Sequence, residues 1–234
     1  MIEEKDLESF LYVSKTKYQI FVFNKKELIN VYSDELKVDN RLNFYDFSNL
    51  PKFLDENIYK IEKKIGNFIK NIVLILKDDQ NLHVNISIKK KNYDGSINQK
   101  YLVNNLTELK DLYKENYPNE NIMHMIIINY IIDGKKYSSF RNNLTSNNLC
   151  LEVNFISISN ELVFRLSKIL EKYQIKIYQF MCGNYIKNFF HDDHNEISLM
   201  ACKLRNGYNE NEAIVIPKNI ENKGFFEKFF QLFS

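Results

Sequence analysis

The order in which strand-like and helix-like segments follow one another most constrains the fold of this chain. Residues 10–38 contain two or three segments rich in β-branched and aromatic residues, which predict strands. A helix is expected next, because Ser48 or Asn49 can cap it and Pro51 suits its first turn. Residues 72–76 are an unbroken apolar run, typical of a strand buried on both faces. This order predicts a mixed α+β (α/β) fold and excludes a helical bundle or a β-sandwich.

A second section rich in strands runs from about residue 82 to residue 158. Residues 82–88 alternate strictly between apolar and polar, which predicts a strand with one wet face. The remaining expected elements are a helix at 106–113 capped by Asn105, strands at 122–132 and 149–158, a helix at 161–173, a strand at 175–180, a short helix at 185–190, and a hairpin of 196–204 with 213–216.

Composition limits the class of protein. The chain has 234 residues, of which 44% are hydrophobic and 26% charged, and a formal net charge of +2. This is enough apolar material for one domain or two small lobes. Lysine and arginine are nearly matched by acidic residues, so no nucleic-acid partner is expected. The three cysteines form no C-x-x-C pair, which indicates reduced thiols in a cytoplasmic compartment. The acidic start predicts no signal peptide.

Glycine is scarce, and its positions exclude a familiar class of nucleotide site. The chain has six glycines, and no two of them are close together. A phosphate-binding loop needs clustered glycines so that backbone N–H groups can approach the anion. Neither G-x-G-x-x-G nor G-x-x-x-x-G-K-S/T occurs in the sequence. A glycine-rich nucleotide loop is therefore excluded.

One run of residues suggests a metal centre. His191, Asp192, Asp193 and His194 are residue types that bind metals. Four adjacent residues point at one ion only if the loop wraps around it, so a solvated loop is the preferred interpretation. A metal-dependent enzyme centred on His191–His194 is the less favoured alternative. We find no other catalytic constellation, and we expect neither an enzyme nor a bound cofactor.

Residues 224–234 have a different character. At roughly 100° per residue, one side of a helix here would be apolar and the other polar. The apolar side comprises Phe225, Phe226, Phe229, Phe230, Leu232 and Phe233. The polar stretch 218–223 before it is typical of a tether. We expect an amphipathic helix that binds a membrane surface weakly and reversibly. The alternative is a helix docked on its own domain.

Residues 121–134 and the phenylalanine-rich segment together resemble the FtsA family, the actin-like proteins that tie the bacterial division ring to the membrane. His124, Tyr130, Asp133 and Gly134 are similar to a "hydrophobic–His–hydrophobic, then Tyr, then Asp-Gly" strand and turn of that family. In FtsA this strand belongs to an inserted small domain, called 1C, of the SHS2 type. The segment at 224–234 resembles the family's membrane-targeting helix.

The resemblance implies a domain layout. Residues 1–80 would form a partial actin-like lobe, 81–158 an SHS2/1C-like interaction domain, 159–217 the return to the lobe, and 218–234 the tether and amphipathic helix. The chain also departs from the family. The turn Val13-Ser14-Lys15-Thr16-Lys17 lacks the Asp and Gly of the FtsA phosphate loop, and residues 196–204 lack those of the second lobe. These departures argue against ATP binding and, because most of the second lobe is missing, against FtsZ binding.

The sequence therefore predicts a shortened, nucleotide-free FtsA-like adaptor. We expect it on the cytoplasmic side of the inner membrane, at the division site. The partners that the resemblance implies are the lipid surface, cell division proteins and further copies of the chain. A PilM-like adaptor serving another envelope machine is the alternative within the same structural class.

Overall fold

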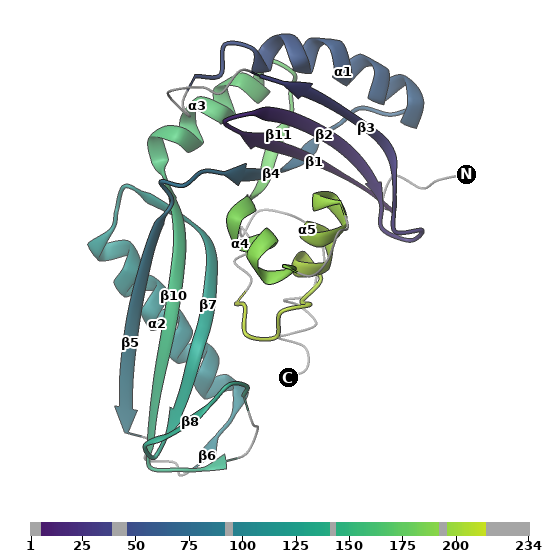
Figure 1. Cartoon of the computed structure of the whole chain (residues 1–234). Helices are drawn as coiled ribbons and strands as arrows, with labels where there is room; N and C mark the ends of the chain where they lie inside the picture. The colour runs from purple at the N-terminus through teal and green to yellow at the C-terminus, as the bar shows by residue number, and fades with distance from the viewer. Residues whose placement is uncertain (1–5, 39–45, 92–95, 141–143, 192–195, 214–234) are drawn as a thin grey trace. The chain divides into compact units, whose positions relative to one another are not determined.

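The computed structural model describes residues 6–38, 46–91, 96–140, 144–191 and 196–213. Contacts divide the chain into two compact units (Figure 1). Unit 1 comprises Met1–Asn81 and Asn160–Arg205, and unit 2 comprises Leu82–Ser159 and Asn206–Ser234. The first segment of unit 2 is thus inserted in the sequence of unit 1.

Unit 1 is built on a five-stranded sheet in the order β11-β4-β1-β2-β3. The strands are β1 (Leu7–Ser14), β2 (Lys17–Asn24), β3 (Ile29–Lys37), β4 (Asn71–Lys77) and β11 (Lys176–Cys182). The first three form an antiparallel meander, and β4 and β11 run parallel to β1. The predicted mixed α+β fold is therefore confirmed.

Helices cover both faces of this sheet (Figure 1). α1 (Leu50–Ile65) and α3 (Asn160–Glu171) lie on one side, and α4 (Gly183–Phe189) and α5 (Ile197–Arg205) lie on the other. α1 begins directly after Asn49, has Pro51 in its first turn and ends at Gly66, whose φ of 72° is left-handed. The core on the α4 and α5 side contains Phe10 and Tyr12 of β1.

The predicted hairpin of 196–204 with 213–216 is wrong, because Ile197–Arg205 is the helix α5. Six of its nine residues are buried, namely Ile197, Ser198, Met200, Ala201, Cys202 and Leu204. A short segment buried on most sides shows neither the helical nor the strand period clearly. The helix brings Met200, Ala201 and Leu204 into the core that also contains Phe21 and Phe23 of β2. Residues 214–216 lie outside the described part of the chain.

Unit 2 is built on a four-stranded antiparallel sheet in the order β5-β10-β7-β8. Its strands are β5 (Leu82–Lys91), β7 (Glu120–Ile132), β8 (Lys135–Tyr137) and β10 (Asn148–Ser159). The short strands β6 (Ser96–Ile97) and β9 (Leu144–Thr145) form a separate pair. α2 (Gln99–Asn116) covers one face of the sheet, where the ring of Tyr113 stacks 4.5 Å from that of Phe155. The main elements run strand, helix, strand, strand: β5, α2, β7 and β10.

The helix expected at 106–113 extends to Gln99–Asn116. The cap is Asn98, whose side chain accepts a hydrogen bond from the Tyr101 N–H at 2.9 Å. Asn105, the expected cap, is buried inside the helix and donates to the Tyr101 carbonyl. Among the described residues, no helix is long and apolar enough to cross a membrane.

Candidate functional site

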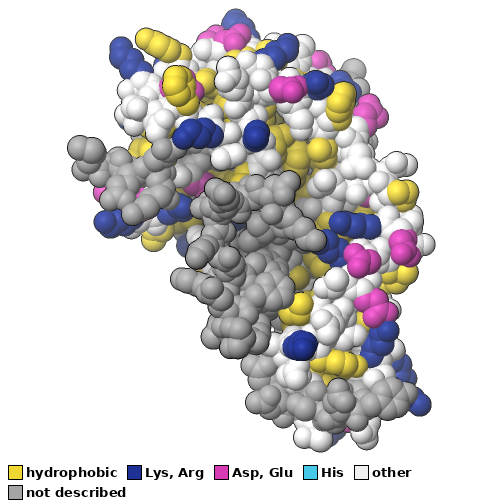
Figure 2. All heavy atoms as spheres, turned by 180° about the vertical axis from the view of Figure 1, so that it is seen from behind, with side chains coloured by type: hydrophobic (Ala, Val, Ile, Leu, Met, Phe, Trp, Pro, Cys, Tyr) yellow, Lys and Arg dark blue, Asp and Glu magenta, His cyan; other side chains and the backbone are white. Residues whose placement is uncertain are grey.

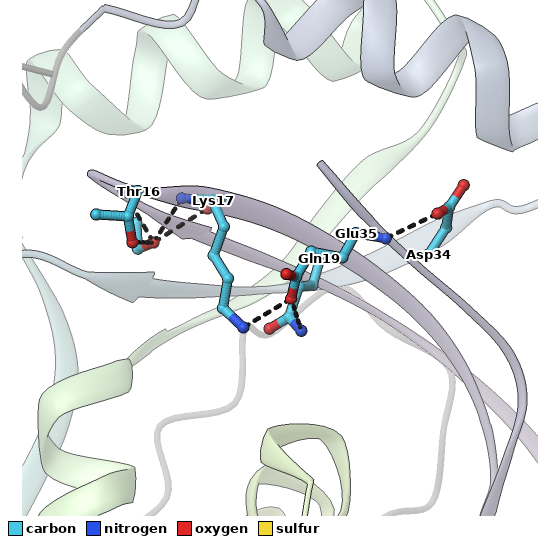
Figure 3. A network of polar contacts seen from close by, with 6 residues as sticks. Thr16, Lys17, Gln19, Asp34 and Glu35 are labelled. Carbon is cyan, nitrogen blue, oxygen red and sulfur yellow. Dashed lines mark hydrogen bonds and ion pairs between the residues drawn. The ribbon is translucent and has the colours of Figure 1, made fainter. Parts of the chain in front are cut away.

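The carboxyl ends of β1, β4 and β11 meet at one edge of the unit 1 sheet, and open α/β sheets bind ligands beyond such an edge. β1 and β2 are joined there by a turn from Ser14 to Lys17 (Figure 3). The Ser14 hydroxyl oxygen accepts hydrogen bonds from the backbone N–H of Lys17 at 3.1 Å and of Thr16 at 3.4 Å. These amide groups are bonded to a side chain, whereas a phosphate loop directs its amides at the anion.

Lys17 is held beside this turn by a polar network (Figure 3). Its Nζ lies 2.7 Å from Oε2 of Glu35, and Gln19 donates to the same oxygen at 2.6 Å. The hydrogen bond from Lys17 holds the pKa of the Glu35 carboxyl below its usual value. Lys17 Nζ also lies 5.9 Å from the ring centre of Tyr12, and Lys187 Nζ lies 5.7 Å from the same ring. Two cations therefore lie within cation–π distance of one aromatic ring.

Lys187 extends this arrangement into a cluster of ammonium groups. Burial lowers the pKa of Lys187, and the positive charges of Lys77 and Lys17 lower it further. The three lysines come from the end of β4, the start of β2 and α4. Lysine side chains are hydrogen-bond donors only, so the cluster can attract an anion but supplies no acceptor for a proton.

α4 starts directly against the end of β4. A Cβ added at Gly183 would lie 3.2 Å from Cβ of Lys77 and 3.3 Å from the carbonyl oxygen of Leu76, so glycine allows this close approach. The sulfur of the preceding Cys182 accepts hydrogen bonds from the Tyr185 N–H at 3.4 Å and the Asn81 amide at 3.3 Å. Burial raises the pKa of Cys182, which keeps the thiol neutral and unreactive.

The motif residues predicted from the FtsA resemblance lie along β7 and the turn after it, in unit 2. His124 is buried, and its Nδ1 lies 2.6 Å from Oε1 of Glu212. Tyr130 is also buried, and its hydroxyl donates to the Asn211 side chain at 3.3 Å. Burial raises the pKa of Tyr130 to about 12. Both side chains therefore hold residues 211 and 212 against β7.

Asp133 and Gly134 form the predicted turn between β7 and β8. Both have positive φ, 45° and 83°, as a two-residue hairpin turn of type I′ requires. The Asp133 carboxylate accepts hydrogen bonds from the backbone N–H of Asn148 at 3.0 Å and of Asn147 at 3.4 Å. The turn is thereby tied to the start of β10.

A feature that sequence reasoning missed is a strap along β7, formed by residues 211–213. The Ile127 N–H donates to the Asn211 carbonyl, and the Ala213 N–H donates to the Met125 carbonyl, both at 2.8 Å. Glu212 forms an antiparallel bridge with Ile126. No local pattern in the sequence indicates the strap, because the residues that it pairs with are far away in the chain.

Two sets of predicted residues fall outside the described part of the chain. They are the membrane-binding set Phe225, Phe226, Phe229, Phe230, Leu232 and Phe233, and the residues Asp192, Asp193 and His194 of the alternative metal site. Among the residues that are described, no group of histidine, cysteine and acidic side chains could hold a metal. On the face shown in Figure 2, positive and negative side chains are interspersed.

No protein-family model and no curated protein matches this sequence. Several solved structures are similar in shape, including the following three. The PilM–PilN type IV pilus biogenesis complex has a TM-score of 0.47 and 9% identity, and the match covers 78% of this chain and 49% of that chain. A protein from Bacteroides thetaiotaomicron with an actin-like ATPase fold and unknown function has a TM-score of 0.36 and 12% identity, with 79% of this chain and 56% of that chain covered. The cytoplasmic domain of EpsL, an inner-membrane component of the Vibrio cholerae type II secretion system, has a TM-score of 0.34 and 9% identity, with 77% of this chain and 57% of that chain covered. The chain thus spans about half the length of each structure. Scores and identities this low decide no function.

Proposed function

We propose that this chain is an actin-like adaptor without enzymatic activity, which attaches protein partners of a cell-envelope machine to the cytoplasmic face of the inner membrane. The more specific form of the proposal is an FtsA-like adaptor of cell division. The alternative is a PilM-like adaptor of another envelope machine.

One observation carries the proposal: a separate α+β unit is inserted in the actin-like lobe between β4 and α3. Its strand, helix, strand, strand order supports an SHS2-type domain, as the FtsA resemblance implies. Such a domain offers a sheet for protein contacts.

The turn between β1 and β2 supports the absence of ATP binding. The backbone amides of Thr16 and Lys17 are bonded to the Ser14 hydroxyl, and the turn contains no glycine. We expect titration calorimetry with Mg-ATP to give no saturable heat. Stoichiometric binding of ATP would contradict the nucleotide-free form of the proposal.

Membrane attachment is tested with liposomes of anionic and neutral lipids. The whole chain should sediment with them, while a chain ending at Lys223 and the double change Phe229→Glu with Phe230→Glu should stay in the supernatant. Gln231→Glu adds charge on the predicted polar side and serves as the matched control. Equal sedimentation of the truncated and whole chains would disprove the attachment.

The location of the protein in cells tests whether it serves cell division or another envelope machine. A fluorescent copy of an FtsA-like adaptor should form a band at the division site, and this band should disappear with the two phenylalanine changes. A copy that gathers at the poles or in scattered foci would favour the PilM-like alternative.

A further inference from the structure

β5 forms one edge of the unit 2 sheet, and no described strand pairs with its outer side (Figure 1). It is ten residues long, and it pairs with β10 in a regular register from Leu82 to Lys91. An edge strand presents a row of N–H and C=O groups that readily pair with another strand. The length and regularity of β5 therefore make it suited to binding an extended segment.

The side chains of β5 lie in two rows. Val84, Ile86 and Ile88 pack against the core of unit 2 on the side of α2, yet they remain only partly buried. The alternate residues His83, Asn85, Ser87, Lys89 and Lys91 are exposed. A strand added beside β5 would finish covering the apolar row if it carried apolar residues at matching positions.

Charge is confined to one end of this edge. Lys89, Lys90 and Lys91 are consecutive, and Nζ of Lys90 lies 2.6 Å from Oε1 of Glu108 of α2. A second β5 running parallel would place these lysines beside the same lysines, which is unfavourable. A second β5 running antiparallel would place the two lysine clusters at opposite ends of the interface.

We propose that β5 binds β5 of a second copy of this chain, antiparallel and centred on Ile86, so that the two unit 2 sheets become one. In this register Ile86 lies opposite Ile86, and Val84 lies opposite Ile88, which joins the two apolar rows. On the other face Asn85 lies opposite Ser87, and Lys89 lies opposite His83. The register thus places apolar residues opposite apolar residues and keeps the two lysine clusters apart. The proposal does not depend on the adaptor function.

Disulfide cross-linking between two chains that each carry one accessible cysteine tests the register, since Cys182 and Cys202 are buried. In a Cys150→Ser background, one chain carries Asn85→Cys and a second, of different tag length, carries Ser87→Cys. Residues directly opposite in an antiparallel pair have Cβ atoms about 4.5–5.5 Å apart, whereas diagonal neighbours are farther apart. The mixed 85–87 dimer should therefore form in excess over the 85–85 and 87–87 dimers. Lys114→Cys on the exposed side of α2 is the control for random collision.

Paired charge changes test the interface without cysteine chemistry. Asn85→Glu with Ser87→Lys places two pairs of opposite charges across the interface. Sedimentation velocity should show a dissociation constant of the dimer that is lower by about twofold to thirtyfold. Asn85→Lys with Ser87→Lys should loosen the dimer, while circular dichroism shows that both variants fold. The proposal is overturned if no cross-link exceeds the Lys114→Cys control, if 87–87 dimers dominate, or if the two charge variants associate equally.

Discussion

His124 Nδ1 lies 2.6 Å from Glu212 Oε1, although 88 residues separate the two in the chain. Their side chains are 0% and 6% exposed. This contact, with the two backbone hydrogen bonds of the strap, fixes residues 211–213 to β7. Residues 218–234 follow the strap in sequence, so the membrane-binding segment that we propose there would be joined through the strap to unit 2, the proposed interaction unit.

Replacing Glu212 with Ala should destabilise unit 2. The change removes the carboxylate that bonds to the buried His124 ring, and losing one partner of a buried hydrogen bond typically costs about 1–3 kcal/mol. Hydrogen exchange followed by mass spectrometry should show faster exchange at the amides of Ile127 and Ala213, which bond across the strap. Urea unfolding should show the lower free energy of unfolding.

The control for this change is Glu210→Ala, which removes the same charge from an exposed position in the same segment. Glu210→Ala should leave exchange at Ile127 unchanged. If the two variants exchange equally fast, the buried pair is not what holds the strap.

Stability should fall at alkaline pH because of buried tyrosines. Burial raises the pKa of Tyr12 in unit 1 and of Tyr130 in unit 2 from 10.0 to about 12. The folded state therefore favours the neutral phenol, so this contribution is full below pH 10 and is lost as the pH rises toward 12. Urea unfolding between pH 8 and pH 12 should show the loss, and Tyr12→Phe and Tyr130→Phe should each make it less steep. Tyr59→Phe, at a position that is 70% exposed, should not.

Most elements were predictable where side chains repeat with a clear period. The alternation in β5 and the apolar stripe of α1 are such patterns. α5 was not predictable, because burial on most of its surface removes the polar stripe that marks a helix. The start of α2 was missed because Asn98 and Asn105 are equally good caps by residue type, and only the fold decides between them.

At the candidate site, only the lack of a glycine-containing phosphate loop could be predicted from the sequence. The absence of glycine between Ser14 and Lys17 is visible in the sequence. The convergence of Lys17, Lys77 and Lys187 is not, because they come from three elements that only the sheet brings together. The strap is likewise a long-range pairing without a local signal.

Gly183 and Gly134 should respond to alanine for different reasons. At Gly183 a new Cβ meets the β4 backbone, so Gly183→Ala should lower the stability of unit 1 by about 1–3 kcal/mol. At Gly134 nothing lies within 4 Å and the cost comes from a φ of 83° alone, so Gly134→Ala should cost about 1–2 kcal/mol. Gly134→Asn, which tolerates positive φ, should recover much of that loss, and Gly183→Asn should recover none. Thermal unfolding of the four variants distinguishes the two causes, and equal rescue by asparagine would contradict them.

Replacing Arg205, even with lysine, should destabilise unit 1, because Arg205 fixes the end of α5 to the sheet. Its Nε donates to Gln179 at 2.8 Å, its guanidinium lies 4.9 Å from the ring centre of Tyr178, and it pairs with Glu8 of β1. Lysine keeps the charge but loses the planar group that bonds and stacks at once, so Arg205→Lys should cost about 1–3 kcal/mol. Arg165→Lys, at a side chain that is 44% exposed, is the matched control and should change stability little. Urea unfolding followed by tyrosine fluorescence suits a chain without tryptophan. Equal effects of the two substitutions would mean that packing of the apolar residues alone holds α5 in place.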